Sequence, residues 1–282
     1  MTARRVAFPD PQGRIANRGW VKRRSTTAVA LTVAGSDSGG GAGIQADLKT
    51  FRAHGVFGTS AITCVTAQNP DRVSAVQAIE PRIVGEQMDR VFEAFRIGGA
   101  KTGMLYDTAI IEVVADGFAR RRFTKLVVDP VMVASSGALL LKEGAIRALT
   151  TKLFPHAVVV TPNLAETEVL LRRPIRSLDE LRTAARSLAE AYGVPFLVKG
   201  GHLPGAKQAV DVLFDGRRFQ EYRAALVPNI RTHGTGCTFS AAIAANLALG
   251  HGLAGSVARA KRFVSRAIRT ALRVGRYSAL RI

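Results

Sequence analysis

One segment of this chain combines glycines with a cysteine directly before an apolar helical stretch. It reads Thr232-His233-Gly234-Thr235-Gly236-Cys237 and precedes the apolar residues 238–249. Glycines at a helix start leave backbone N–H groups unpaired, and their partial positive charge suits the negative charge that develops on a transferred phosphoryl group. A cysteine in the first helical turn is expected to have a lowered pKa, so Cys237 could accept a proton from an attacking hydroxyl group. The alternative is that Cys237 packs as a small buried apolar residue.

A second segment is rich in glycine. Residues 35–43 follow the first predicted strand, open a predicted helix and contain five glycines in nine positions. That content exceeds what a tight turn needs, so we expect the backbone to approach a ligand closely; a plain turn is the alternative. The segment lacks the lysine of a P-loop, and residues 41–46 match the dinucleotide fingerprint only in a relaxed form.

Polar residues also follow three apolar strands. They are Asp129, the pair Asn163 and Glu166, and Lys199. Acids at strand ends can hold Mg²⁺, mainly through water molecules, and a lysine can neutralise nucleotide phosphates. Each charged residue has a structural alternative, because Asp129 could cap a turn, Glu166 could be a first-turn helix acid and Lys199 could be solvated.

Other kinds of site lack their sequence signatures. The five histidines form no His-x-x-x-His pair, the two cysteines have no Cys-x-x-Cys spacing, and no Gly-x-Ser-x-Gly elbow is present. The sequence therefore predicts no zinc site, no disulfide framework and no hydrolase nucleophile. The cysteine content fits a reducing, cytoplasmic location.

The elements that position these residues alternate between β-branched apolar runs and longer segments of helical period. This pattern is typical of an α/β fold with a mainly parallel sheet, in which ligands bind beyond the carboxyl ends of the strands. We expect one domain over residues 28–275, a disordered basic extension over 1–27 and a basic tail over 276–282. The predicted strands cover 28–34, 59–66, 125–129, 157–161 and 195–199, with an antiparallel pair at 210–214 and 218–223, and the predicted helices cover 42–54, 82–95, 108–121, 143–153, 164–171, 178–192, 235–249 and 254–272.

The net charge of +19 lies largely at the two ends of the chain. Residues 1–27 carry seven basic residues and one acid, and residues 261–282 carry seven basic residues and no acid. No apolar run approaches the roughly 20 residues that cross a bilayer, so no membrane span is expected. The predicted last helix bears arginines at spacings of three and four, which indicates a solvated face, with polyanion binding as the alternative. These are Arg259, Arg262, Arg266, Arg269, Arg273 and Arg276.

Seven segments together resemble the hydroxymethylpyrimidine/phosphomethylpyrimidine kinases, with order and spacing kept from about residue 29 to about residue 274. The resemblance implies a ribokinase-like three-layer sandwich, with a mostly parallel sheet between helices, a small β flap and usually a homodimer. It also implies transfer of the γ-phosphoryl group of ATP-Mg²⁺ to 4-amino-5-hydroxymethyl-2-methylpyrimidine, and in many members to its monophosphate, for thiamin synthesis. The segments are AGSDSGGGAGIQADLKT (34–50), AQN (67–69), KTGML (101–105), DPVM (129–132), TPNLAE (161–166), VKGGH (198–202) and HGTGC (233–237).

The same resemblance assigns roles to matching positions. Cys237 would be the base, and the backbone of Gly234, Thr235 and Gly236 would cradle the transferred phosphate. Lys199, Asn163 and Thr232 would contact ATP, while Asp129 and Glu166 would organise Mg²⁺. The pyrimidine pocket would be lined by Gly35, Asp47, Gln68, Met104 and Val131. Gln68 is the strongest of these, because an amide both donates and accepts hydrogen bonds and so can pair with an aminopyrimidine edge.

Two departures and two rival functions accompany the resemblance. Ser135 stands where the family often has lysine, and residues 275–278 replace the family's usual Gly-Pro-containing end. The nearest rival function is a pyridoxal or pyridoxine kinase on the same scaffold. A rival of another class is a nucleic-acid-associated protein that uses the arginine-bearing helix, although nucleic acid is not the partner that the motifs favour.

Overall fold

A nine-stranded sheet forms the centre of the molecule in the computed structural model, which describes residues 27–132, 141, 143–201, 203–227 and 233–282. The strand order is β3-β2-β1-β4-β5-β6-β7-β8-β9, with parallel pairing from β2 through β7 and antiparallel pairing at both edges. The antiparallel β2–β3 pair supplies the small β flap. The strands are β1 (Val29–Asp37), β2 (Phe57–Gln68), β3 (Val73–Ala78), β4 (Ile97–Thr102), β5 (Leu126–Val128), β6 (Ala157–Val160), β7 (Phe196–Gly200), β8 (Gln208–Phe214) and β9 (Phe219–Ala225).

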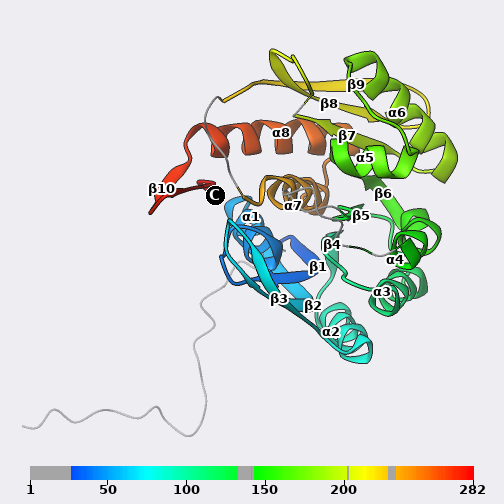
Figure 1. The fold of residues 1–282 in the computed structure, drawn as a ribbon. Coiled ribbons are helices and arrows are strands. Elements are labelled where there is room, and N and C mark those ends of the chain that lie inside the picture. Colours follow the sequence, from blue (N-terminus) through cyan, green and yellow to red (C-terminus); the bar gives the residue numbers. More distant parts are fainter. Residues whose placement is uncertain (1–26, 133–140, 142, 202, 228–232) are drawn as a thin grey trace, which may run out of the picture.

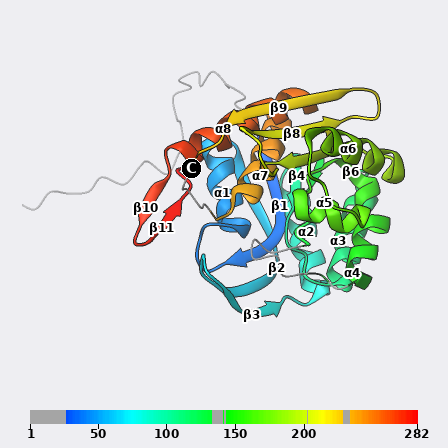
Figure 2. The ribbon, with the colours of Figure 1, turned by 45° about the horizontal axis from the view of Figure 1, so that its top comes forward.

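Helices cover both faces of the sheet, as Figures 1 and 2 show. One face carries α1 (Gly43–Ala53), α7 (Thr235–Ala248) and α8 (Leu253–Arg269). The other face carries α2 (Pro81–Ala94), α3 (Thr108–Arg120), α4 (Glu143–Ala148), the π-helical turn η1 (Leu149–Leu153), the 3₁₀ turn η2 (Phe154–His156), α5 (Leu164–Leu171) and α6 (Leu178–Tyr192). The predicted α/β sandwich is therefore confirmed.

Two hydrophobic cores result from the alternation of side chains along each strand. In β5, Val127 packs in the core under α7, while Leu126 and Val128 face the core of the opposite helices. Strands buried on both faces read as nearly continuous apolar runs, which is why the sequence pattern identified them. No helix in the described residues is long and apolar enough to cross a membrane.

The observed elements differ from the predicted ones in several places. Strands β3 and β4 were not predicted, and the predicted helix over 143–153 is α-helical only to Ala148. The last helix ends at Arg269, and Gly275, with φ +58°, turns the chain between β10 (Leu272–Val274) and β11 (Tyr277–Ala279). Arg273 and Arg276 therefore do not continue the arginine face of α8, and β11 lies in the predicted tail. The extension 1–26 lies outside the described residues.

Helix α7 lies unusually close to β4 because β4 contains two glycines. A Cβ atom added at Gly99 would lie 2.3 Å from the carbonyl oxygen of Ala244, and one added at Gly98 would lie 3.0 Å from that of Ala248. Backbone atoms cannot move aside as a flexible side chain can, so this contact fixes the depth at which α7 sits.

We expect Gly99→Ala to destabilise the protein by about 1–3 kcal/mol, because the added methyl group overpacks the β4–α7 contact. Gly255→Ala is the matched control, since Gly255 is exposed in α8 with no atom near its Cβ position. Alanine favours a helix over glycine by about 1 kcal/mol, so the control should unfold at equal or higher urea concentration. Equal stability of Gly99→Ala and the native protein would contradict the close contact.

Candidate active site

The predicted site residues gather at the carboxyl ends of the parallel strands. The glycine-rich loop follows β1, Gln68 ends β2, Asp129 follows β5, and Lys199 lies at the end of β7. Open α/β sheets bind ligands at this edge. The strand order separates the β1–β2 side from the β5–β7 side, and the start of α7 contacts both.

The first turn of α7 is held between the glycine-rich loop and a lysine–aspartate pair. Gly234 has φ +82°, and a Cβ atom there would lie 1.7 Å from the carbonyl oxygen of Gly41. A Cβ atom at Gly236 would lie 3.4 Å from Lys199 Nζ and 3.7 Å from Asp129 Oδ2. Only glycine fits at Gly234, and the backbone N–H groups that follow begin a helix, which is the arrangement that binds phosphate groups.

Cys237 lies in this first turn, but its pKa is not lowered as we predicted. Burial raises the pKa of the Cys237 thiol to about 11, and the nearby carboxylates of Asp47 and Asp129 act in the same direction. The Lys101 ammonium group and a backbone hydrogen bond from Gly43 oppose this shift. Burial therefore outweighs the helix terminus. Cys237 is nevertheless partly exposed, unlike Cys64, so it can meet a ligand.

Lys101 forms a buried ion pair that sequence reasoning missed. Lys101 Nζ lies 3.1 and 3.3 Å from the two carboxylate oxygens of Asp47, and Thr32 Oγ1 donates to Asp47 Oδ2 at 2.7 Å. Both charged side chains are fully buried. Burial alone would lower the pKa of Lys101, but the Asp47 carboxylate, with further contributions from Cys237 and Asp129, raises it. Asp47, predicted to line the pyrimidine pocket, is instead shielded from solvent in this pair.

A second buried lysine–aspartate pair lies on the nucleotide side. Lys199 Nζ donates to Asp129 Oδ1 at 3.1 Å, and Ser240 Oγ donates to Asp129 Oδ2 at 3.1 Å. Burial would lower the pKa of Lys199, but the carboxylates of Asp129 and Glu166 raise it. Lys199 is therefore charged and paired with Asp129. The alternative that Lys199 is a solvated side chain does not hold.

Glu166 and Asn163 form the capping box of α5. Asn163 Oδ1 accepts from the Glu166 N–H at 2.9 Å, while the Glu166 carboxylate accepts from the N–H groups of Asn163 at 2.8 Å and Met132 at 3.1 Å. Burial raises the pKa of Glu166, and Asp129 adds to this while Lys199 opposes it. Glu166 is therefore a first-turn helix acid, which was the structural alternative. Its carboxylate also lies close enough to Asp129 for the two to interact electrostatically.

These residues fit Mg²⁺ in the way that kinases hold it. Within the described residues, no three His, Cys, Asp or Glu side chains cluster as a metal cage. Kinases bind Mg²⁺ through one or two carboxylates, substrate phosphates and water. The electrostatic contact between the carboxylates of Asp129 and Glu166 fits this donor set.

Three of the predicted pyrimidine-pocket residues lie around the ends of β1, β2 and β4. A Cβ atom at Gly35 would lie 3.8 Å from Met104 Cβ, so these two residues are neighbours. Gln68 is half-buried at the end of β2. Val131 lies on the opposite side of the site, beside Met132, and its φ of +44° is strained for a β-branched residue. Thr232 lies outside the described residues, as does the loop with Ser135.

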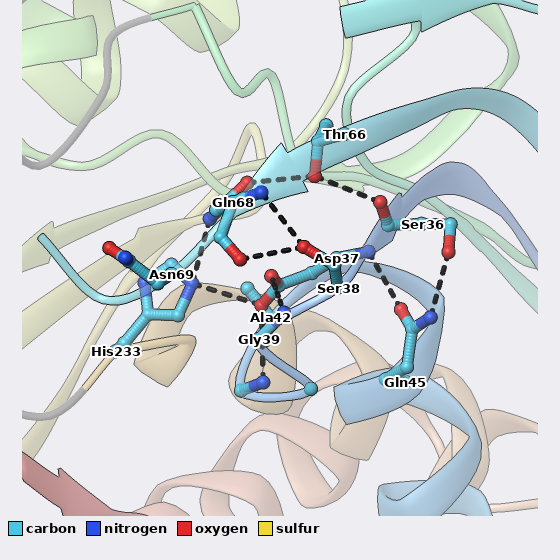
Figure 3. A network of polar contacts seen from close by, with 12 residues as sticks. Ser36, Asp37, Ser38, Gly39, Ala42, Gln45, Thr66, Gln68, Asn69 and His233 are labelled. Atoms are coloured by element: carbon cyan, nitrogen blue, oxygen red, sulfur yellow. Dashed lines mark hydrogen bonds and ion pairs between the residues drawn. The ribbon is translucent and has the colours of Figure 1, made fainter. Parts of the chain in front are cut away.

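His233 joins the two glycine loops, and our sequence analysis did not assign it a role (Figure 3). Its Nε2 atom lies 3.1 Å from Asp37 Oδ2 and 2.9 Å from the side-chain amide of Gln68. Asp37 in turn accepts from the N–H groups of Gly39, Gly41 and Ala42. Burial would raise the pKa of Asp37, but the hydrogen bonds from His233, Ala42 and Gly39 lower it. The sequence signal for His233 was its position directly before Gly234. The sequence prediction weighed the histidines only as metal ligands.

The chain is similar to known proteins over most of its length. The family model described as phosphomethylpyrimidine kinase matches residues 37–280. A hydroxymethylpyrimidine/phosphomethylpyrimidine kinase from Rhizobium meliloti is 48% identical over 250 residues, which cover 88% of this chain and 93% of the relative. A thiamine biosynthesis bifunctional protein from Geobacter sulfurreducens is 47% identical, and the chain spans 50% of its length. The solved Bacillus subtilis pyridoxal kinase, an ADP complex, is 35% identical with a TM-score of 0.84, and the match covers 90% of this chain and 97% of that one.

The raised pKa of Cys237 predicts slow alkylation at neutral pH. Only the thiolate reacts, so the rate of labelling by iodoacetamide should rise about tenfold per pH unit from neutral pH toward pH 11. Lys101→Met removes the opposing positive charge and should slow labelling further at each pH. Mass spectrometry resolves Cys237 from Cys64, which is buried and should react more slowly.

The double variant Asp47→Asn/Lys101→Met is the control for folding. Breaking one partner of a buried ion pair costs about 3–5 kcal/mol, whereas the double variant leaves no unpaired buried charge. A labelling rate that already reaches its plateau near neutral pH would contradict the raised pKa.

Proposed function

Because this chain belongs to the phosphomethylpyrimidine kinase family, we propose that it transfers the γ-phosphoryl group of ATP to 4-amino-5-hydroxymethyl-2-methylpyrimidine, to its monophosphate, or to both. The observation that carries the proposal is the position of the first turn of α7. Its N–H groups and Cys237 lie between Lys199–Asp129 on one side and the Gln68 network on the other. Phosphoryl transfer from a nucleotide to a small polar ring needs charged groups on the nucleotide side, N–H donors at the transferred group and polar groups on the ring side.

The chain's own residues would act mainly by position and charge. The hydroxymethyl oxygen forms a bond to the γ-phosphorus as the bond from phosphorus to the ADP oxygen breaks, and the hydroxyl proton is lost. Phosphoryl transfer asks chiefly for alignment and charge neutralisation. The N–H groups of the turn at Gly234, Thr235 and Gly236 would receive the phosphoryl oxygens, and Cys237 would take the proton once it is a thiolate.

The nucleotide would lie over the carboxyl ends of β5, β6 and β7. Lys199 would neutralise phosphate oxygens, with Asn163 and Thr232 as further contacts to ATP. Asp129 and Glu166 would hold Mg²⁺, which would help to neutralise the charge that develops on the phosphate groups. Lys199 pairs with Asp129 in this structure, so the pair would be remodelled when phosphates and a cation arrive.

The pyrimidine would lie at the ends of β1, β2 and β4, with Gly35 and Met104 against its ring and Gln68 at its polar edge. Val131 would approach from the opposite side. Asp47 would act through Lys101 and not by direct contact, because its carboxylate is buried in the ion pair. A cytoplasmic homodimer completes the proposal, and sedimentation of the purified protein tests the dimer.

Phosphorylation of pyridoxal is the second candidate, because the Bacillus subtilis pyridoxal kinase superposes with a TM-score of 0.84. Both substrates carry a hydroxymethyl group on an aromatic ring, so the phosphate machinery would serve either. The polar edge of the ring is what differs. The discriminating residues are therefore those around Gln68 and not those around Cys237.

The deciding assay offers ATP with hydroxymethylpyrimidine, its monophosphate or pyridoxal, and resolves the products by mass. We expect pyrimidine phosphates as main products, and the two pyrimidine substrates separate the first phosphorylation from the second. Product from pyridoxal alone would move the chain to vitamin B6 salvage. The absence of product from all three would overturn the proposed kinase activity.

We expect Cys237→Ala to lower turnover by orders of magnitude while ATP binding, measured by calorimetry, stays within about twofold, because in the proposed arrangement the thiol would face the acceptor and not the nucleotide. Cys237→Ser is the matched control for size and polarity, and its higher pKa should leave it nearly as slow. Turnover of Cys237→Ala equal to that of the native protein would remove Cys237 from the mechanism.

A further inference from the structure

His233 and Gln68 form a polar network with Asp37 and Thr66 in which the available protons satisfy one orientation of the Gln68 amide better than the other. Thr66 Oγ1 lies 3.0 Å from the carbonyl oxygen of Ser36 and 3.2 Å from the side-chain amide of Gln68. His233 Nε2 lies 2.9 Å from the other end of that amide and 3.1 Å from Asp37 Oδ2. Figure 3 shows these contacts converging on Gln68 from the two sides.

The amide of Gln68 can occupy its position with nitrogen or with oxygen toward His233. With nitrogen toward His233, the imidazole Nε2 must be a bare acceptor, and its lone pair then faces the Asp37 carboxylate at 3.1 Å. In the same orientation, Thr66 has one hydroxyl proton for two acceptors, the Ser36 carbonyl and the Gln68 oxygen. The contact between Nε2 and Asp37 is thus left without a proton, and the two contacts of Thr66 share one.

With oxygen toward His233, no contact is left without a proton, and only the two contacts of His233 Nε2 share one. Nε2–H donates to the Gln68 oxygen and to Asp37 Oδ2, Thr66 donates to the Ser36 carbonyl, and the Gln68 amide nitrogen donates to Thr66 Oγ1. Asp37 is 3% exposed and is held by three backbone N–H groups, so its position is fixed. A partly buried network that leaves no contact without a proton is favoured over one in which a lone pair faces a carboxylate.

We propose that His233 is the positioning residue that sets the orientation of the Gln68 amide, and through it the order of donor and acceptor that the protein presents to the polar edge of its substrate. The proposal rests on the proposed function for the identity of that substrate. His233 acts through Gln68 and does not contact the reacting atoms.

The backbone around Gln68 supports this role. Ser38 Oγ donates to the Gln68 carbonyl at 2.6 Å and accepts from the Gln68 N–H at 2.8 Å, so the main chain is fixed to the glycine-rich loop. Only the amide then remains to be oriented, and His233 and Thr66 are its two side-chain partners. Because His233 directly precedes Gly234, the group that orients the ring edge belongs to the same turn that receives the phosphoryl group.

The first test reads the proton directly and needs no substrate. In protein labelled with ¹⁵N-histidine, the His233 signal, assigned by its loss in His233→Gln, should show a protonated Nε2 throughout the neutral and alkaline range. Both ring forms that carry this proton, the imidazolium and the Nε2–H tautomer, agree with the proposal. A bare Nε2 would overturn it, whichever reaction the protein catalyses.

The second test is a double-mutant cycle on the ring substrate. His233→Ala should raise the KM for the ring substrate roughly tenfold, which is the loss of a positioned hydrogen bond, with little change in the KM for ATP. His233→Gln, which can place an N–H near the Nε2 position, should recover most of this loss. His233→Ala in a Gln68→Ala background should have little further effect on KM. His251→Ala, in the α7–α8 turn, is the control.

Additive effects of the two substitutions would show that His233 acts only by holding the loops together, and would overturn the proposal. The cycle is run with whichever of the pyrimidine and pyridoxal the native protein phosphorylates. Failure of the native protein on the pyrimidine is therefore a failure of the proposed function, while additivity on an active substrate is a failure of the role of His233.

Discussion

The depth of helix α7 is the constraint on which the active site depends. Its body lies against the glycines of β4, and its first residue is preceded by Gly234, which packs on the Gly41 carbonyl. No side chain separates these backbones, so the helix start cannot shift without moving the glycine-rich loop. The N–H groups at its start are therefore placed with the accuracy of backbone packing and not of side-chain contacts.

This placement has an electrostatic cost that two lysines offset. The helix start brings Cys237 near two carboxylates, Asp47 and Asp129, in a region where water is scarce. Each carboxylate has its own lysine, Lys101 for Asp47 and Lys199 for Asp129. The two pairs differ in access, because Lys101 is fully buried while the Lys199 side chain is 14% exposed. The inner pair therefore acts as a fixed charge balance, whereas the outer pair can exchange partners with phosphate groups.

Much of this architecture could be predicted from residues alone, and the failures have physical reasons. Apolar strands such as β6 and the helix start at Gly234 carry local signals, and both are where we expected them. Strand β4 was missed because Ile97–Thr102 contains two glycines and Lys101, which are not typical of a buried strand. Their place in the sheet is explained only by their contacts with α7 and α1. The arginine spacing continued past Arg269, but Gly275 and the pairing of β10 with β11 ended the helix.

The errors at the site itself share one cause, which is that local rules ignore neighbours distant in sequence. The pKa of Cys237 was predicted from the helix terminus, but burial dominates it, and Lys101, Asp47 and Asp129 supply the nearby charges. The contact of the Glu166 carboxylate with the Met132 N–H, 34 positions away, was missed for the same reason. His233 is the same case, because its partners Asp37 and Gln68 are 196 and 165 positions distant. A network that closes between loops so far apart leaves no periodicity in the chain, and only the proton count in three dimensions reveals it.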